Sequence, residues 1–507
     1  MNAPVADTGQ SSRLSLPALA LLLLVLTAIK LFVAGHAGLA FDEGYYTFWS
    51  ERLQPGYLDH PPVVAVLIAA GRALLGDNEL GVRLFSILSG LVLSGLLWRM
   101  GFVLLGRRAA TLAVILYNTA PVAALGIIAT PDPPSTLFWT AALWAVAEFV
   151  ASRRPAWWLV AGVMAGLGLW SKYTVAFLAP GLLLYLLVSA ERRQWLHLWQ
   201  VWAGGLLALI VFSPVIWWNW RHGWASFTFQ GRRTVVAALD SNVLGNFGDF
   251  LLAQALYMAP VLFVATIIGA IACLAQRGRG VRGLELPVWT SLPALAYFVF
   301  HTLHALVDGN WLMPLWPPLT LAAAWALLAL FDRRGAWAKA ALCLQLALGI
   351  VPMLAFYIQA VWQPWNLGAP DRTSETRGWR PLEQQLGQLA ASNGARWIAT
   401  SGNYGVTGEL AAYALFAGSP YPVRQVDEPA RWWFLPPLAP DIAAAPALFV
   451  RPEPNPDNPA LPTGAFGAAK LLSVLPRDDT GTPPEAWSVF LVDKPSAEVI
   501  SRLVGSH

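Results

Sequence analysis

Two pairs of ionisable side chains stand at either end of a short polar stretch near the start of the chain. Asp42 and Glu43 directly follow the first long apolar segment, and Asp59 and His60 directly precede a Pro-Pro pair and a second apolar run. Carboxylates at a membrane boundary are costly unless they are used, and a carboxylate there can accept a proton from a hydroxyl or an amine. The pattern predicts acid–base chemistry on a lipid-borne substrate. The alternative is a solvated loop whose residues begin and end helices.

Two further charged residues interrupt apolar surroundings. Asp132 lies in the sequence Pro-Asp-Pro-Pro, on a short connection without other charge, and is either a helix N-cap or part of the site. Lys172 lies in the sequence Trp-Ser-Lys-Tyr near the predicted outer end of an apolar segment. A lysine there either snorkels to the membrane surface or binds an anion, and the sequence leaves both alternatives open.

A metal site has only weak support in the sequence. His301, His304 and Asp308 fall on one face of a predicted helix, and two histidines at that spacing can hold a metal, although core or capping roles are favoured. Cys273 and Cys343 both lie in apolar segments, so no disulfide framework is predicted. We expect that no cofactor is required; a divalent metal is compatible with the sequence but is not predicted.

The elements that must position these residues are apolar helices. Of the 507 residues 56% are hydrophobic and 12% are charged, whereas soluble proteins carry about 25% charged residues. Repeated apolar stretches near 20 residues long identify a polytopic α-helical membrane protein. Eleven transmembrane helices are predicted, at residues 14–33, 80–98, 110–128, 135–151, 156–174, 175–190, 200–218, 249–275, 287–305, 311–331 and 338–360. The apolar stretch 63–75 is too short to cross and is predicted to lie in the membrane interface.

Basic residues concentrate in alternate connections, as the positive-inside rule requires. The alternation places the N-terminus in the cytoplasm and places residues 34–79, 129–134, 219–248 and 306–310 on the outer face. The basic residues that fall outside against this rule are candidates for binding phosphate: Arg52, Arg72, Arg83, Arg221, Arg232 and Arg233. Because basic residues set membrane orientation, the net charge of +4 does not indicate a nucleic-acid partner.

The composition changes after residue 360. Residues 1–360 form the predicted transmembrane domain, and residues 361–507 are rich in Pro, Gly and charged residues. A small α/β domain on the outer face is predicted there, with helices near 382–392 and 409–416 and strands near 396–399, 447–450 and 487–492. Gly402-Asn403-Tyr404-Gly405 before a helix resembles a phosphate-binding loop, but a strand–turn–helix link that needs glycines is favoured.

In this order the motifs resemble the GT-C membrane glycosyltransferases. The resemblance is carried by Phe-Asp-Glu-Gly-Tyr-Tyr from residue 41, Tyr-Leu-Asp-His-Pro-Pro from 57, Gly-Val-Arg-Leu from 81, Ala-Thr-Pro-Asp from 129 and Ser-Lys-Tyr-Thr from 171. The chain is similar to the dolichyl-phosphate-mannose–protein mannosyltransferase superfamily. Within it, the chain resembles bacterial transferases that add aminoarabinose or galacturonic acid to lipid A or lipopolysaccharide core. Asp-His-Pro at 59–61 stands where aminoarabinose transferases carry Glu-Lys-Pro, so the resemblance does not fix the sugar.

The resemblance also implies a mechanism. It implies a polyprenyl-phosphate-linked sugar donor, a lipid or glycolipid acceptor, and inverting, metal-independent transfer on the periplasmic face of a bacterial inner membrane. Asp42 matches the base that deprotonates the acceptor, with Glu43 and Asp132 as further catalytic candidates. The positions expected near the donor phosphate or the substrate are Asp59, His60, Arg83, Lys172, Tyr173, Arg232, Arg233 and Asn310.

Three other functions fit part of the sequence. A protein O-mannosyltransferase-like enzyme or an O-antigen-ligase-type enzyme would show similar outer loops. A polytopic lipid or sugar transporter, or a flippase, would explain the spans and the intramembrane charges, but not an acidic outer loop or a large outer domain. Transfer of a radiolabelled sugar from a polyprenyl-phosphate donor separates an enzyme from a transporter.

Overall fold

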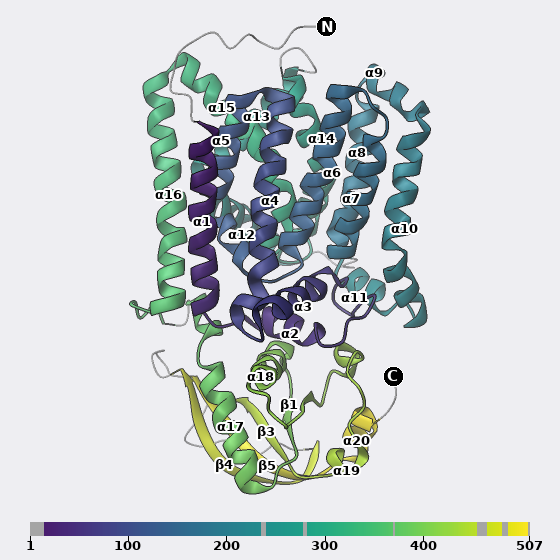
Figure 1. Ribbon diagram of the computed structural model, residues 1–507, viewed down its shortest axis with the longest axis vertical. Coiled ribbons are helices and arrows are strands. Elements are labelled where there is room, and N and C mark those ends of the chain that lie inside the picture. Colours follow the sequence, from purple (N-terminus) through teal and green to yellow (C-terminus); the bar gives the residue numbers. More distant parts are fainter. Residues whose placement is uncertain are drawn as a thin grey trace. The chain divides into compact units, whose positions relative to one another are not determined.

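The chain divides into two compact units in the computed structural model, which describes residues 15–234, 240–276, 281–368, 371–453, 464–478 and 485–504. We call them the helical unit and the sheet unit, and Figure 1 labels their elements. The helical unit comprises Met1–Lys30, Ser86–Ile127 and Pro131–Ala355, and the sheet unit comprises Leu31–Phe85, Ile128–Thr130 and Phe356–His507. The domain boundary expected at residue 360 stays a prediction.

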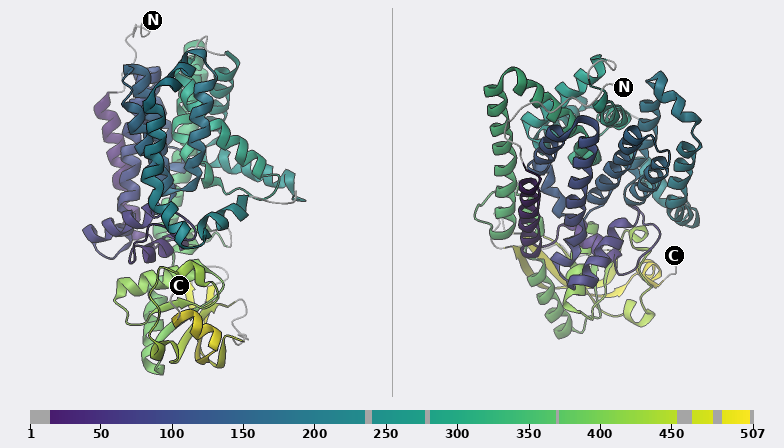
Figure 2. Two further views of the ribbon diagram at one scale, coloured as in Figure 1. Left: turned by 90° about the vertical axis from the view of Figure 1, so that its right-hand side faces the viewer. Right: turned by 45° about the horizontal axis from the view of Figure 1, so that its top comes forward.

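Most helices of the helical unit are apolar, and its longest helices run side by side in Figure 2. Its longer helices are α5 (Arg107–Asn118), α6 (Asp132–Ser152), α7 (Trp157–Ser171), α8 (Leu178–Leu187), α10 (Trp199–Arg221), α11 (Ala225–Thr234), α12 (Val243–Met258), α13 (Pro260–Gln276), α14 (Glu285–His301) and α15 (Trp316–Arg333). Shorter pieces are η1 (Pro121–Ala123), η2 (Leu125–Ile127), η3 (Tyr173–Phe177), α9 (Ala190–Arg193), η4 (Gln194–His197), η5 (Arg282–Leu284) and η6 (Gly309–Leu315). Three helices contribute to both units: α1 (Leu16–His36), α4 (Glu79–Leu105) and α16 (Gly335–Trp362).

The predicted class of polytopic membrane protein is confirmed. Among the described residues, seven helices are long and apolar enough to cross a membrane, or up to ten if each of three bent pairs is one span. The prediction of eleven also counted α7, which has 15 residues and falls short of that length.

Three expected spans are bent, which the sequence prediction did not anticipate. The bend is 68° between α5 and η1–η2, 116° between η3–α8 and α9–η4, and 105° between α12 and α13. Pro121 begins η1 and Pro260 begins α13. Proline lacks a backbone N–H and disfavours a helical conformation in the residue before it, so two of the three breaks have a local cause.

Small residues bring neighbouring helices together in the helical unit. A Cβ atom on Gly162 of α7 would lie 2.1 Å from the backbone oxygen of Gly204 in α10. Glycine is therefore required for this close backbone approach, as is common where helices associate in membranes.

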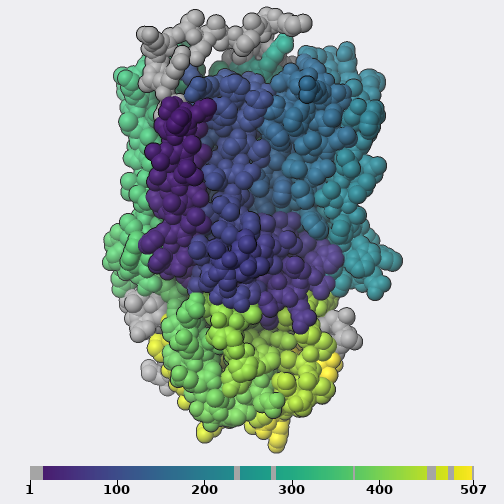
Figure 3. Space-filling view, viewed as in Figure 1, coloured from purple at the N-terminus to yellow at the C-terminus, as the bar shows by residue number. Residues whose placement is uncertain are grey.

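Helix α1 forms part of the surface of the helical unit in the space-filling view (Figure 3). Leu21 and Leu24 are 63% and 57% exposed, as expected of side chains that face lipid. Lys30 is an exception because it is only 9% exposed.

The sheet unit holds the remaining elements. Its helices are α2 (Phe41–Trp49), α3 (Val63–Leu75), η7 (Arg372–Thr376), α17 (Trp379–Asn393), α18 (Tyr404–Ala417), η8 (Pro429–Trp432), α19 (Pro440–Ala443) and α20 (Ala497–Val504). Its strands are β1 (Trp397–Thr400), β2 (Val423–Gln425), β3 (Ala447–Pro452), β4 (Phe466–Asp478) and β5 (Glu485–Pro495). The strands form one sheet in the order β2-β1-β3-β5-β4, in which β1 is parallel to β2 and β3, and β5 is antiparallel to β3 and β4. The predicted α/β class is confirmed.

Glycines join α2 to α18 within the sheet unit. A Cβ atom on Gly44 would lie 2.7 Å from the backbone nitrogen of Glu409, and one on Gly408 would lie 2.5 Å from that of Tyr45. The side chain of Asn403 accepts a hydrogen bond from the backbone N–H of Gly405 and caps α18. The glycines of α18 thus allow it to pack tightly on the helix that carries Asp42.

Candidate active site

The first turn of α2 separates two neighbouring acids into different environments. Glu43 is at the third helical position, where its Oε2 accepts a hydrogen bond from the backbone N–H of Ala40 at 2.9 Å. This is the carboxylate half of a capping box. Asp42 precedes it and is half-buried. Because consecutive residues of a helix point about 100° apart, the two carboxylates have different partners.

Glu43 and Arg83 form a buried ion pair. Glu43 is 0% exposed and Arg83 is 2% exposed, and two hydrogen bonds of 2.8 and 2.5 Å run from the guanidinium to the carboxylate. The backbone N–H of Ala129 also donates to Glu43, at 2.8 Å. The other guanidinium N–H groups donate to three backbone oxygens at the end of α1, those of Ala34, Ala37 and Gly38. This geometry favours an architectural role for both residues over contact with a substrate.

Asp42 accepts a hydrogen bond from a residue of the sheet unit that lies 362 positions later in the chain. The hydroxyl of Tyr404, the first residue of α18, donates to Asp42 Oδ1 at 2.8 Å. Burial raises the pKa of Tyr404, and the adjacent charge of Asp42 raises it further. Tyr404 therefore remains a neutral hydrogen-bond donor to the carboxylate throughout the physiological pH range.

Asp59 is buried and is held by two donors. The hydroxyl of Tyr45 donates to Oδ2 at 2.8 Å, and Arg431 donates to Oδ1 at 2.5 Å. The Arg431 guanidinium also lies 4.4 Å from the ring centroid of Tyr404. Burial lowers the pKa of Arg431, but the charges of Asp59, Tyr45 and Glu428 and the hydrogen bond to Glu428 together outweigh burial, so the pKa is raised overall. A network of Asp59, Arg431 and Tyr404 therefore leads to Asp42.

His60 follows Asp59 but faces different neighbours. It is half-buried, and its ring lies edge-on to Tyr46 at a centroid distance of 6.3 Å. The Pro-Pro pair after it leads into α3, and Pro62 is the N-cap residue of that helix.

The helical unit brings three sequence-predicted residues together. Asp132 at the start of α6 accepts a hydrogen bond from Lys172 Nζ at 2.6 Å on Oδ1, and from Asn310 Nδ2 at 2.9 Å on Oδ2. Lys172 follows α7 and Asn310 lies in η6, so the three residues come from distant segments. Asp132 and Lys172 are both buried. Lys172 thus does not snorkel, and Pro131, not Asp132, is the N-cap residue of α6.

The remaining predicted site residues are more scattered. The Tyr173 hydroxyl lies 2.8 Å from Ser226 Oγ, and Arg232 in α11 is exposed. The side chain of Arg233 lies outside the described residues. His301 is buried at the end of α14, with the ring of Trp311 at 5.8 Å, whereas Asp308 is exposed. Within the described ranges, no group of three or more His, Cys, Asp or Glu side chains is arranged to hold a metal ion.

Three residues of the network that contains Asp42 and Asp59 were not predicted as site residues: Tyr45, Tyr404 and Arg431. Tyr45 and Tyr404 lie in stretches that the sequence had marked, the acidic motif and the Gly402–Gly405 turn. Arg431 carries no local signal, because its contact to Asp59 joins positions 372 apart. Glu409 is completely buried in α18, and neither of its carboxyl oxygens has a hydrogen-bond partner among the described residues.

The fold and the motif region have known relatives. Residues 59–218 match the family model described as dolichyl-phosphate-mannose-protein mannosyltransferase. The crystal structure of ArnT from Cupriavidus metallidurans bound to undecaprenyl phosphate matches with a TM-score of 0.58 and 17% identity, covering 97% of this chain and 100% of that one. The similarity in structure shows a shared fold. The matched region carries most of the motifs quoted above, in agreement with the resemblance to the GT-C membrane glycosyltransferases.

Two relatives of known activity are similar to this chain in sequence. The lipid A galacturonosyltransferase RgtD of Rhizobium johnstonii is 26% identical over 361 residues, which cover 71% of this chain and 72% of the relative. The undecaprenyl phosphate-alpha-4-amino-4-deoxy-L-arabinose arabinosyl transferase of Pseudomonas savastanoi is 29% identical over 147 residues, or 27% of each chain. The chain is therefore similar to transferases of both sugar types that the motifs indicated.

Proposed function

We propose that the protein transfers a sugar from a polyprenyl-phosphate donor to lipid A or a related envelope glycolipid, with inversion, and that Asp42 is the base. The observation that carries the choice of base is the contrast within α2. Glu43 is completely buried against Arg83, whereas Asp42 is half-buried and hydrogen-bonded to a neutral tyrosine. A carboxylate that takes a proton must reach the substrate, and Asp42 is the more accessible of the two.

The chemistry follows from that assignment. The Asp42 carboxylate accepts the proton of an acceptor hydroxyl as its oxygen attacks the anomeric carbon of the donor sugar. The new bond joins that oxygen to the anomeric carbon, and the bond to the phosphate oxygen breaks, so that polyprenyl phosphate leaves with the electron pair. Attack from the face opposite the phosphate inverts the configuration. The lipid tail keeps both donor and product in the bilayer.

The substrates are proposed from the relatives. The similar lipid A galacturonosyltransferase supports lipid A as acceptor, and the similar arabinosyl transferase names an undecaprenyl phosphate sugar. Orientation is proposed from the distribution of basic residues, which supports a periplasmic site; a periplasm-dependent reporter enzyme fused after Ala360 should be active. No metal is assigned a step, and transfer is expected to persist in a chelator.

The assignment of Asp42 is tested by single-turnover transfer of labelled sugar to lipid A in nanodiscs. Asp42→Asn keeps the size of the side chain but removes its proton affinity, so the rate should fall by about 10²–10⁴-fold while donor binding persists. Asp77→Asn, which alters an exposed carboxylate after α3, is the matched control and should be unchanged.

A near-normal rate in Asp42→Asn would remove the proposed base. The family model is described by a protein mannosyltransferase, so a peptide acceptor is the second candidate. Labelling of protein, with no labelling of lipid A, in wild-type membranes would establish that alternative.

A further inference from the structure

Lys30 is a buried cation in the apolar helix α1. The helix is exposed along most of its length, but Lys30 turns inward and is 9% exposed. A charged side chain in a membrane-spanning segment normally faces a partner, a cavity or a substrate path, because its burial is costly. Lys30 has neither a hydrogen bond nor an ion pair with any residue that the structure describes.

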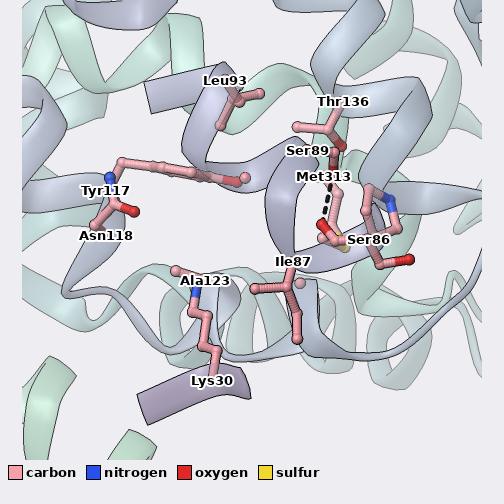
Figure 4. Close-up of a pocket in the computed structure, with 13 residues that line it drawn as sticks. Lys30, Ser86, Ile87, Ser89, Leu93, Tyr117, Asn118, Ala123, Thr136 and Met313 are labelled. Carbon is pink, nitrogen blue, oxygen red and sulfur yellow. Dashed lines mark hydrogen bonds between the residues drawn. The ribbon is translucent and has the colours of Figure 1, made fainter. Parts of the chain in front are cut away.

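The Lys30 side chain extends into a pocket of the helical unit, as Figure 4 shows. The pocket lies among α1, α4, α5, η1, η2, α6 and η6, and none of its 13 lining residues is acidic. Four lining residues carry N–H or O–H donors that have no partner in the described parts of the chain: Lys30, Ser86, Tyr117 and Thr136. We call these four residues the donor pocket.

Thr136 gives independent support for a ligand. It is 2% exposed, and its Oγ1 is buried without a hydrogen-bond partner among the described residues. The Tyr117 hydroxyl points into the same pocket (Figure 4). Buried polar groups are nearly always satisfied in native structures, so the buried Thr136 hydroxyl calls for a partner. Together with the other donors around Lys30, it is complementary to a group rich in acceptors. An oxyanion matches both the charge and the hydrogen-bonding capacity.

The donor pocket adjoins the group formed by Asp132, Lys172 and Asn310, which we call the Asp132 cluster. Its wall includes Pro133 and Thr136 of α6, which follow Asp132, and Met313 of η6, which follows Asn310 by three positions. In that cluster Lys172 already has a carboxylate partner. Lys30 therefore supplies a positive charge that the Asp132 cluster does not neutralise.

We propose that the donor pocket binds one oxyanion of a lipid-linked substrate, with Lys30 as the principal ligand. The oxyanion is a carboxylate of a uronic acid or the phosphate of the polyprenyl carrier, which present the same chemistry. An ammonium group, as on a 4-amino sugar, would be repelled by Lys30, and the pocket lining offers no carboxylate to pair with it. The assignment of the oxyanion to a transferase substrate rests on the proposed function.

The experiment compares Lys30→Met, which keeps the length of the side chain, with Lys339→Met, which removes an exposed lysine of α16. Binding of undecaprenyl phosphate is measured in nanodiscs, and transfer to lipid A is measured from undecaprenyl-phosphate galacturonate and from the neutral galactose analogue. Thr136→Val provides a second, smaller change of the donor pocket if Lys30→Met does not fold; the loss expected for it is about threefold, against at least tenfold for Lys30→Met.

Two results support the proposal and distinguish the ligands. If the phosphate is bound, Lys30→Met weakens undecaprenyl phosphate binding at least tenfold and affects both donors. If the sugar carboxylate is bound, undecaprenyl phosphate binding is retained and only galacturonate transfer falls at least tenfold. If Lys30→Met and Thr136→Val behave like Lys339→Met in both binding and transfer, the proposal that the donor pocket binds an oxyanion is wrong. If undecaprenyl phosphate binding depends on Lys30 but the wild type transfers neither sugar, the proposed function fails and the pocket stands.

Discussion

Two buried cations of the molecule have opposite surroundings. Arg83 in the sheet unit donates to Glu43 and to three backbone oxygens, so its charge and its N–H groups are used within the chain. Lys30 in the helical unit has no such partner among the described residues. Both were basic residues in apolar surroundings, but the first stabilises the fold and the second is left for a ligand. The presence of a counter-charge, more than burial, distinguishes the two roles.

The largest effect on stability is expected from Arg83→Leu. Removing one partner leaves the Glu43 carboxylate buried and uncompensated, which typically costs about 3–5 kcal/mol. Thermal unfolding in detergent should show this loss, whereas Lys30→Met should leave the unfolding temperature unchanged or raise it.

A double variant tests whether the loss of stability in Arg83→Leu comes from the unpaired Glu43 carboxylate. The double variant Arg83→Leu/Glu43→Gln removes both charges and should recover part of the stability lost in Arg83→Leu. If Arg83→Leu unfolds like the wild type but loses donor binding, Arg83 contacts the phosphate after all, and the contrast with Lys30 disappears.

Glu409, a buried carboxyl without a hydrogen-bond partner among the described residues, provides the next prediction. Burial raises the pKa of Glu409, and the neighbouring charge of Glu43 raises it further; Glu79 acts in the same direction, while Arg83 and Arg477 oppose it. The folded state therefore holds the Glu409 proton more tightly than the unfolded state does. Its stabilising contribution is complete below a pH of about 4.5, the ordinary glutamate value, and is lost as the pH rises toward the folded pKa.

Glu409→Gln should therefore flatten the dependence of stability on pH. At pH 8 the variant should be more stable than the wild type by about 1–3 kcal/mol, the usual cost of a buried unsatisfied polar group, and at pH 4 the two should converge. Unfolding in detergent measures this, with Glu498→Gln on the exposed end of α20 as control. A constant difference at all pH values would show that Glu409 is not protonated on folding.

The smallest effect is expected at Tyr404. Tyr404→Phe removes the hydroxyl that donates to Asp42 and keeps the ring, so one hydrogen bond to a charged group is lost. At about 1.4 kcal/mol this lowers single-turnover transfer about tenfold, with donor binding unchanged. Tyr421→Phe is the control. A loss as large as that of Asp42→Asn would move the proton-transfer role from the aspartate to the tyrosine.

Much of the fold could be predicted because apolar length is a local signal. Helices such as α1, α6, α10 and α16 match predicted spans, and the strands β1, β3 and β5 were expected from short apolar runs. Strand β4 was missed because Phe466–Asp478 contains Gly, Pro and Lys residues that weaken a strand pattern. The bend at Ala259 was also missed, because the apolar run continues through it.

The site was harder to predict because its pairings are not local. The order of motifs singled out Asp42, Asp132 and Lys172, but nothing in the neighbouring sequence shows that Lys172 bonds to Asp132. Arg83 was grouped with phosphate-binding candidates by counting charges on each side of the membrane, a method that does not detect a carboxylate partner 40 positions away. Lys30 lay inside a predicted span and received no role.

The tight contact between α2 and α18 also affects the synthesis of the protein. Asp42 and Tyr404 are 362 positions apart, so α2 is made long before the helix that packs against its glycine face. At about 5–20 residues per second, the interval is roughly 20–70 s. During that time the acidic helix has no α18 to cover it, and a nascent chain stalled before residue 404 would keep Gly44 and Asp42 accessible to proteases and labelling reagents.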